Sequence, residues 1–364
     1  MDDAHQRILA AVAAFARGEL VIVADDDDRE NEGDLFVAAS LCTPEKMAFI
    51  IRHTSGIVCA PLAPEEARRL HLDPMVAFNN APLGTAFTVS VDARHGLTTG
   101  ISAEERNNTV RALANGNSGA ADFVRPGHVF PLIAKEGGVL MRSGHTEACV
   151  DLCRLAGLPP VGVLAELMND DGTVMRGPEL AVFAERHRLQ RISIAELIAY
   201  RQARDKLIER VGEFPVESEI GTLNGYAFLT PFDPVYHMAF VHGRIGDGKN
   251  VLTRLHRANL ISDLFGGAKP IHSTLARFKA EGRGVLVVLR DGTAGVPVVA
   301  IPKSDESASG EARSRQWREV GLGAQILKDL GVNSIRILTS SRRMTYVGLS
   351  GFGIEIVGTE PVEG

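Results

Sequence analysis

Hydrophobic residues recur with a helical period in some segments of the chain and in short continuous runs in others. The helical spacing predicts a helix over residues 4–17 and a second over 145–157, which ends at Gly157. Short apolar runs predict strands, at residues 19–24, 35–38, 56–62 and 160–167. An alternation of apolar and polar residues over 86–92 predicts a half-buried strand. Helices and strands that alternate along a chain are typical of an α/β fold.

Capping residues mark further helix starts. Thr43-Pro44 combines a polar cap with a proline at the first helical position. Ser102 and Glu105 have the spacing of a capping box, in which each side chain binds the backbone N–H of the other residue. Two more helices are expected, over about 178–189 and 193–206.

The pattern changes after about residue 206. Runs of strand length then follow one another, in LIERVGEF, YAFLTPF, YHMAFVHG and NVLTRLH. A strand over GVLVVLR, a helix near residues 311–330 and a strand over SIRILTS complete the chain. We therefore expect two domains, residues 1–206 and 207–364, and the fold class α/β with α+β character.

Composition and charge narrow the functional classes. The 364 residues are 45% hydrophobic, enough for two domains with their own cores. The formal net charge of −6 provides no basic field for nucleic acid or an anionic membrane surface. No apolar run approaches the ~20 residues that span a bilayer, and the acidic N-terminus is unlike a signal peptide. We expect a cytoplasmic protein that binds neither nucleic acid nor membrane.

The four cysteines (Cys42, Cys59, Cys149 and Cys153) are too few for a disulfide scaffold in a chain of this size. All of them precede residue 154, so a metal site in the second half would need His, Asp or Glu ligands. Cys149 and Cys153 lie four residues apart on a predicted helix. No second pair accompanies them, so packing is the favoured interpretation.

Seven carboxylates crowd the ten residues DDDDRENEGD, which we call the acidic segment (residues 25–34). It resembles the start of a calcium-binding EF-hand loop, but the twelfth position, counted from Asp28, holds Ala39 instead of a bidentate carboxylate. Mg²⁺ remains compatible, because it takes only one or two protein carboxylates. The alternative is a solvated acidic turn, and Arg29 and Gly33 favour a ligand site over it.

Arg142-Ser-Gly-His-Thr146 opens the predicted helix over 145–157. Backbone N–H groups at a helix N-terminus, together with these polar side chains, favour a bound anion such as phosphate. His145 has an alternative interpretation as an ordinary residue of the first turn.

Two further residues have acid–base chemistry. His128 follows Pro-Gly in RPGHVFPL, where it is either a turn residue or an acid–base group. Glu166 lies in the apolar run of LAELMNDDGT, where an ionised carboxylate requires a partner or a metal. Together these segments suit a metal-assisted reaction on a small phosphorylated polyol.

Six segments in this order resemble the 3,4-dihydroxy-2-butanone 4-phosphate synthase family of riboflavin biosynthesis: DDDDRENEGD, HTSGIVCAPL, FTVSVDARHGLTTGISAEER, RPGHVFPL, GGVLMRSGHTEA and AELMNDDGT. The resemblance covers about residues 5–205. It implies an α/β homodimer that uses Mg²⁺ or Mn²⁺. It also implies conversion of D-ribulose 5-phosphate to L-3,4-dihydroxy-2-butanone 4-phosphate and formate.

The resemblance also implies residue roles. Glu30 and His145 match the metal ligands, and His128 and Glu166 match the essential acid–base positions. Substrate contacts are implied for Arg29, Asp34, Arg142, Ser143, Gly144, His145 and Thr146. Pocket positions are implied for Asp25, Asp26, Glu32, Cys59, Thr98 and Thr99.

The second half resembles GTP cyclohydrolase II, most closely in VGLGAQILKDLGVNSIRILTS and GLSGFGIEIV. That family holds zinc with three cysteines, whose positions here are occupied by Asn259, Pro270 and His272. The family's Asp-x-Arg motif reads Gln316-Trp317-Arg318, so its acid is missing. Its Glu-Gly-Arg-Gly-Ile-Gly phosphate loop is replaced by Arg290-Asp-Gly-Thr-Ala-Gly, and its Asn-Asn-Pro motif by Ser340-Ser-Arg. We therefore expect no zinc and no cyclohydrolase activity in this domain, which leaves a structural or regulatory role. The alternative is a bifunctional enzyme that also opens GTP.

Overall fold

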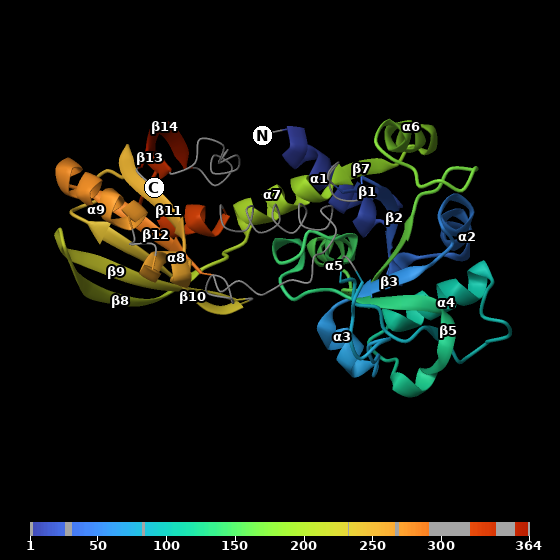
Figure 1. Ribbon diagram of the computed structural model, residues 1–364. Coiled ribbons are helices and arrows are strands. Elements are labelled where there is room, and N and C mark those ends of the chain that lie inside the picture. The colour runs from blue at the N-terminus through green and yellow to red at the C-terminus, as the bar shows by residue number, and fades with distance from the viewer. Residues whose placement is uncertain are drawn as a thin grey trace. The chain divides into compact units, whose positions relative to one another are not determined.

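The computed structural model describes residues 3–25, 31–81, 84–231, 233–265, 269–290, 321–339 and 354–362. The chain divides into two compact units (Figure 1): of the described residues, those up to Tyr200 belong to the first unit and those from Arg201 onward to the second. Each unit contains a seven-stranded sheet with helices packed on it. The α/β fold class and the two-domain organisation are therefore properties of the folded chain.

The sheet of the first unit has the strand order β4-β5-β3-β6-β2-β1-β7. Its strands are β1 (Val21–Ala24), β2 (Gly33–Ala38), β3 (Cys59–Leu62), β4 (Val91–Ala93), β5 (Phe123–Ile133), β6 (Gly162–Glu166) and β7 (Gln190–Ser193). Strands β2 and β6 are buried along almost their whole length, as their unbroken apolar runs predict. They pair antiparallel at the centre of the sheet.

The helices of the first unit are α1 (Asp3–Ala16), α2 (Pro44–His53), α3 (Pro64–Arg69), α4 (Ala103–Leu113), α5 (His145–Leu155), α6 (Pro178–His187) and α7 (Ile194–Arg204), the last of which contains the division between the units. Both predicted caps are present: Thr43 accepts a hydrogen bond from the Lys46 N–H, and Ser102 and Glu105 form the reciprocal capping box. Helix α5 packs against β2, β3 and β6, and α1 contacts α5 and β7 (Figure 1).

Gly162 allows helix α5 to lie very close to strand β6. A Cβ atom at this position would stand 2.2 Å from the Sγ atom of Cys149, far inside van der Waals contact. Cys149 and Cys153 are fully buried in this contact, as the packing interpretation predicts.

One sequence prediction in this unit is wrong. The strand expected over 86–92 is reduced to Val91–Ala93, because Phe87 and Thr88 form only isolated bridges. For His128, the alternative interpretation as a turn residue does not hold, because it lies within strand β5. The ladder shifts register between Val91 and Asp92, which lets β5 pass Pro126 and Gly127 as an irregularity of the strand. Gly127 fits because a Cβ there would collide with the backbone of Val91.

The second unit has the strand order β14-β13-β11-β12-β10-β9-β8. Its strands are β8 (Glu209–Ser218), β9 (Gly221–Thr230), β10 (Asp233–His242), β11 (Val251–Arg257), β12 (Gly284–Leu289), β13 (Ser334–Thr339) and β14 (Glu355–Pro361). Strands β8 to β10 form antiparallel pairs, whereas β11 to β14 pair in parallel. Its helices include α8 (Leu260–Phe265) and α9 (Lys269–Glu281).

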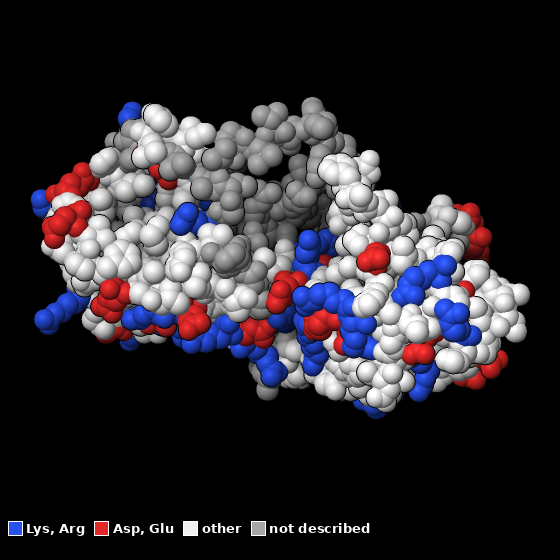
Figure 2. Space-filling model, turned by 90° about the horizontal axis from the view of Figure 1, so that it is seen from below, with Lys and Arg blue, Asp and Glu red and all other residues white. Residues whose placement is uncertain are grey.

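Of the helix predicted near 311–330, residues 321–329 are helical and those before 321 lie outside the described residues. Phe278 of α9, Leu252 and Leu286 lie in a separate hydrophobic core of this unit. Basic and acidic side chains are interspersed on the face of the molecule that Figure 2 shows. None of the described helices combines the length and the apolar character that a bilayer span requires.

Candidate functional site

Strands β2 and β6 bring two of the predicted carboxylates together. Asp34 and Glu166 are directly opposite each other in the antiparallel ladder, so their side chains leave the same face of the sheet. The sequence predicted that Glu166 lies inside an apolar strand. In the structure it is half-buried and is the last residue of β6, so its carboxylate lies at the end of the strand. Asp34 is 2% exposed.

Helix α5 begins at the predicted anion site. Gly144 is its N-cap and His145 its first residue, so the loop from Arg142 leads directly into the first turn of the helix, whose backbone N–H groups have no partner within the helix itself. The His145 ring stands edge-on to Phe36 of β2, with ring centroids 6.1 Å apart. This contact packs the start of α5 against the strand that carries Asp34.

The Arg142 guanidinium is held from two sides. Its Nη1 donates to Oε2 of Glu147 over 2.6 Å, and its Nη2 donates to Oγ1 of Thr85 over 3.2 Å. Glu147 is 1% exposed and also accepts a hydrogen bond from the Lys135 N–H. Such a double constraint preorganises a guanidinium for an anionic ligand.

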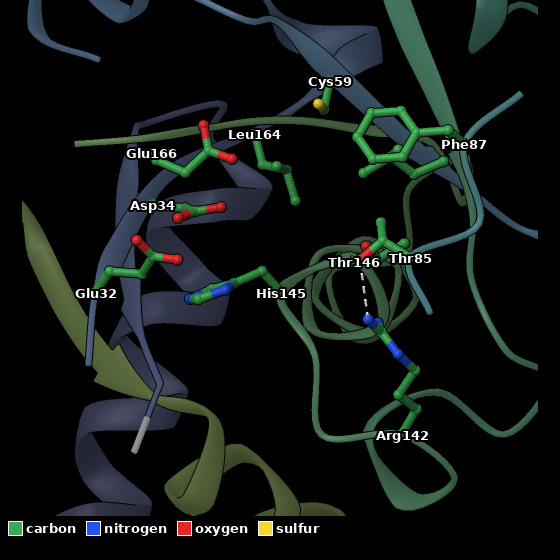
Figure 3. Close-up of a pocket in the computed structure, with 11 residues that line it drawn as sticks. Glu32, Asp34, Cys59, Thr85, Phe87, Arg142, His145, Thr146, Leu164 and Glu166 are labelled. Carbon is green, nitrogen blue, oxygen red and sulfur yellow. Dashed lines mark hydrogen bonds between the residues drawn. The ribbon is translucent and has the colours of Figure 1, made fainter. Parts of the chain in front are cut away.

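These groups line one cavity of about 170 Å³. Its lining consists of Glu32, Asp34, Cys59, Thr85, Phe87, Leu132, Arg142, His145, Thr146, Leu164 and Glu166. Figure 3 shows the carboxylates of Glu32, Asp34 and Glu166 on one side, Arg142 with Thr85 and Thr146 on the other, and His145 between them. The cavity therefore has a cation-attracting side and an anion-attracting side.

Of the predicted residues of the acidic segment that the structure describes, Glu32 and Asp34 line the cavity and Asp25 does not. Asp26, Arg29 and Glu30 lie outside the described residues. Asp25 is buried, donates its N–H to the Glu32 carbonyl over 3.1 Å, and accepts the Glu32 N–H at Oδ1 over 2.9 Å. Asp25 thus has a structural role, because it fixes the backbone of Glu32. Ser143 and Gly144 also stay outside the lining, although they adjoin Arg142 and His145.

His128 belongs to a second cluster, which also lies outside the cavity lining. Its Nδ1 is 2.7 Å from Oδ2 of Asp92, and its backbone N–H donates to Oδ1 of Asp92 over 2.9 Å. The His128 side chain is 42% exposed, whereas that of Asp92 is 4% exposed. A buried carboxylate that orients an exposed imidazole is a common arrangement for acid–base catalysis.

Thr98 and Thr99 are exposed and lie beside this second cluster. Gly100, which follows them, packs against the side chains of Asp92 and His128. The Thr98 hydroxyl donates to Oε1 of Glu105 over 2.8 Å. Thr98 and Thr99 are therefore absent from the cavity lining and adjoin the residue that packs against His128.

The cysteines near the site are poor nucleophiles. Burial, followed by the negative charges of Glu166 and Asp34, raises the pKa of the Cys59 thiol far above its ordinary value. Burial likewise raises the pKa of Cys149 well above its ordinary value. Because the reactive form of cysteine is the thiolate, Cys59 serves the cavity as a neutral, apolar surface.

Sequence reasoning missed four lining residues: Thr85, Phe87, Leu132 and Leu164. Leu164 could have been found, because it lies two residues before Glu166 on the same strand face. Leu132 belongs to the RPGHVFPL segment, but nothing in that segment indicates that its side chain would line a cavity. Thr85 and Phe87 come from an irregular stretch and reach the cavity through tertiary packing alone.

The donor chemistry on the carboxylate side suits a hard divalent ion. Within the described ranges, no three His, Cys, Asp or Glu side chains are close enough together to hold a metal ion by themselves. Mg²⁺ does not require such a cage, since it usually keeps several water or substrate oxygens. Of the two predicted ligands, His145 lines the cavity, and Glu30 falls outside the described residues.

In the second unit, the positions matched to zinc cysteines have ordinary structural contacts. Asn259 donates its N–H to Oδ2 of Asp263 over 2.9 Å. His272 is exposed, with its Nδ1 2.8 Å from Oε2 of Glu219. Pro270 accepts a hydrogen bond from Thr274 at its carbonyl. Residues 316–318, 340–342 and the loop after Arg290 lie outside the described residues.

Comparison with known proteins identifies both units. Residues 9–200 match the family model described as 3,4-dihydroxy-2-butanone 4-phosphate synthase, and residues 209–361 match that of GTP cyclohydrolase II. This chain belongs to the 3,4-dihydroxy-2-butanone 4-phosphate synthase family. As a member it is an enzyme of riboflavin biosynthesis, in which a synthase domain is fused to a GTP cyclohydrolase II family domain. The six segments of the first half predicted the synthase domain, and the two segments of the second half predicted the other family.

Two relatives of the synthase from Arabidopsis thaliana differ in their names. One, a bifunctional riboflavin biosynthesis protein, is 45% identical over 370 residues, covering 97% of this chain and 68% of the relative. The other, a monofunctional riboflavin biosynthesis protein, is also 45% identical over 370 residues, covering 99% of this chain and 78% of the relative.

Two solved structures resemble the synthase fold. RibBX from A. baumannii, a two domain 3,4-dihydroxy-2-butanone 4-phosphate synthase, has a TM-score of 0.82 and 37% identity, covering 97% of this chain and 99% of that one. A 3,4-dihydroxy-2-butanone 4-phosphate synthase in complex with two magnesium ions has a TM-score of 0.54 and 47% identity, covering 54% of this chain and 97% of that one. The predicted fold class is confirmed by these likenesses.

Proposed function

We propose that the first domain converts D-ribulose 5-phosphate to L-3,4-dihydroxy-2-butanone 4-phosphate and formate. The observation that carries this proposal is the two-sided cavity, where carboxylates face an arginine held by Glu147 and Thr85. A phosphorylated polyol matches both sides: its phosphate suits Arg142, Thr146 and the α5 N-terminus, and its hydroxyl and carbonyl oxygens suit the opposite side. The two products contain all the atoms of the substrate, so the reaction needs no redox partner.

Within this proposal, Asp34 and Arg29 contact the substrate, and Glu166 and His128 move protons. Glu166 points into the cavity from the end of a central strand, which fixes it within reach of a bound sugar. Glu30 and His145 would hold Mg²⁺ or Mn²⁺. When bound, the ion supplies positive charge beside the sugar oxygens, where negative charge develops during the reaction. The magnesium ions in the related structure support this assignment.

We also propose a cytoplasmic homodimer that forms through the first domain. Four free, buried cysteines are consistent with a reducing compartment, whereas the plant relatives are named chloroplastic. The position of His128 supports the homodimer. It lies outside the cavity lining of its own chain, so its proposed acid–base role would be met at the cavity of a second chain. A solution mass of two chains is expected in sedimentation.

The proposed reaction is tested with purified protein, Mg²⁺ and D-ribulose 5-phosphate, with formate as the measured product. Glu166→Gln keeps the size of the side chain but removes its ability to accept a proton. We expect it to lower formate release by at least about 10²-fold, the scale of a lost acid–base group. Glu185→Gln, an exposed change on α6, is the matched control. Wild-type turnover by Glu166→Gln, or no formate from the wild type, would contradict the assignment.

For the second domain we propose that cyclohydrolase activity is lost and that a structural or regulatory role remains. No cysteine follows residue 153, so the thiolate ligands expected for the family's zinc are missing. The monofunctional relative and the two domain synthase structure support this interpretation, and the bifunctional relative supports the alternative.

Zinc content and formate release from GTP distinguish the two interpretations of the second domain. We expect less than about 0.1 zinc per chain after purification, because Asn and Pro replace thiolate ligands. We also expect the same protein preparation to release formate from D-ribulose 5-phosphate but none from GTP. Stoichiometric zinc with formate release from GTP would establish the bifunctional enzyme instead.

A further inference from the structure

Ser55 lies outside the cavity lining and contacts Glu166 at two points. Its backbone N–H donates to the Glu166 carbonyl over 2.9 Å, and its hydroxyl donates to Oε2 of Glu166 over 2.8 Å. A single residue therefore fixes both the backbone and the carboxylate of the residue at the end of β6. We propose that Ser55 is a positioning residue for Glu166, an inference that rests on the proposed function of Glu166.

The direction of the Ser55 hydroxyl follows from its surroundings. The Ile57 N–H donates to Oγ of Ser55 over 3.3 Å, so this oxygen is an acceptor on one side. Its single hydrogen is then available for the Glu166 carboxylate, which accepts but does not donate when ionised. One carboxylate oxygen of Glu166 is engaged by Ser55, and the other remains for a substrate proton.

The loop that carries Ser55 is itself fixed from several sides. The Thr54 hydroxyl donates to the Ile50 carbonyl at the end of α2 and accepts the Gly56 N–H, and Thr54 bridges to Leu167 of the strand segment that follows Glu166. On the far side, the buried Arg106 donates to the Gly56 carbonyl over 2.8 Å.

This anchoring gives the Ser55 contact a catalytic consequence. A carboxylate on a flexible glutamate side chain samples several rotamers, and only a near-attack orientation transfers a proton efficiently. A hydroxyl fixed to α2 and β6 selects one of these rotamers before the substrate arrives. Ser55 contributes no group to the cavity surface, so the substrate should bind equally well without it.

The test compares Ser55→Ala with Ser55→Thr, which keeps a hydroxyl. We expect Ser55→Ala to lower kcat for formate release about tenfold or more, with KM for D-ribulose 5-phosphate within about twofold of the wild type. Ser55→Thr is expected to restore kcat to within about threefold. Thr222→Ala is the matched control, because it removes an exposed hydroxyl–carboxylate bond of 3.0 Å in the second unit.

The outcomes separate this inference from the proposed function. If the wild type releases no formate from D-ribulose 5-phosphate, the proposed function fails. If the wild type is active, three results would each overturn the role of Ser55: unchanged kcat in Ser55→Ala, an equal loss of kcat in Ser55→Thr, or a loss accompanied by a lowered melting temperature. A fall in kcat with intact stability and KM supports it.

Discussion

At the residue scale, the site depends on side chains that hold other side chains. Glu147 holds Arg142, Asp92 holds His128 and Ser55 holds Glu166, each through a hydrogen bond of 2.6 to 2.8 Å. These supporting residues are the part of the site that sequence patterns do not reveal. A buried glutamate at the third position of a helix looks like an ordinary first-turn acid until the fold places an arginine beside it.

Glu147→Gln tests this support on the anion side. The amide keeps the size of the side chain but removes the charge that fixes the Arg142 guanidinium. We expect KM for D-ribulose 5-phosphate to rise about tenfold, because a loss of about 1.4 kcal/mol of binding free energy corresponds to that factor. Glu65→Gln, which breaks the exposed Arg154–Glu65 ion pair of 3.0 Å, should leave KM unchanged. Equal KM values in steady-state kinetics of both variants would contradict the role of Glu147.

At the element scale, the sequence predicts what is local and misses what is tertiary. The starts of α2 and α4 follow from Thr43 and Ser102, because caps act within one helical turn. The course of β5 through Pro126 does not follow from local preference, since it depends on pairing with β4 and on the approach of Gly127 to Val91. The pairing of Asp34 with Glu166 likewise depends on strand order, which the chemistry of the acidic segment does not encode.

Helices α2 and α6 offer a pH-dependent test of packing. Phenylalanine and histidine rings from these two helices form one cluster, in which His53 contacts Phe49, Phe183 and His187. Burial lowers the pKa of His53, and the nearby charges of His187 and Arg52 lower it further. The folded protein therefore prefers the neutral imidazole, and the unfolded chain takes up the proton first as the pH falls below about 6.5.

The free energy of unfolding should consequently decrease between about pH 7.5 and pH 5.5. Urea titrations at each pH measure this slope. His53→Phe should flatten it, because phenylalanine suits the aromatic cluster and does not titrate, while the exposed control His71→Asn should not. A slope that His53→Phe leaves intact would assign the pH dependence to other groups.

At the scale of the whole molecule, each unit has a sheet and a hydrophobic core of its own. All described residues of the cavity lie between Glu32 and Glu166, so the first unit contains the described site in full. The family matches also divide the chain, at residues 200 and 209.

Deletion of residues 207–364 should therefore leave formate release from D-ribulose 5-phosphate within about threefold of the full chain, since a domain with its own core can fold alone. A structural role of the second unit predicts a changed oligomeric state (the number of chains per particle in solution) or a lowered melting temperature in the shortened protein. An unchanged oligomeric state, stability and rate would leave neither a structural nor a regulatory role for it.

The close contact of α5 with β6 has a consequence for the width of the catalytic cavity. His145 and Thr146 belong to α5, and Glu166 belongs to β6. Beside Cys149, only the hydrogen atom of Gly162 lies between the helix and the strand. The distance between α5 and β6 therefore depends on a residue that is not in the cavity lining. We expect a side chain at residue 162 to push α5 away from β6, and so to move His145 and Thr146 away from Glu166.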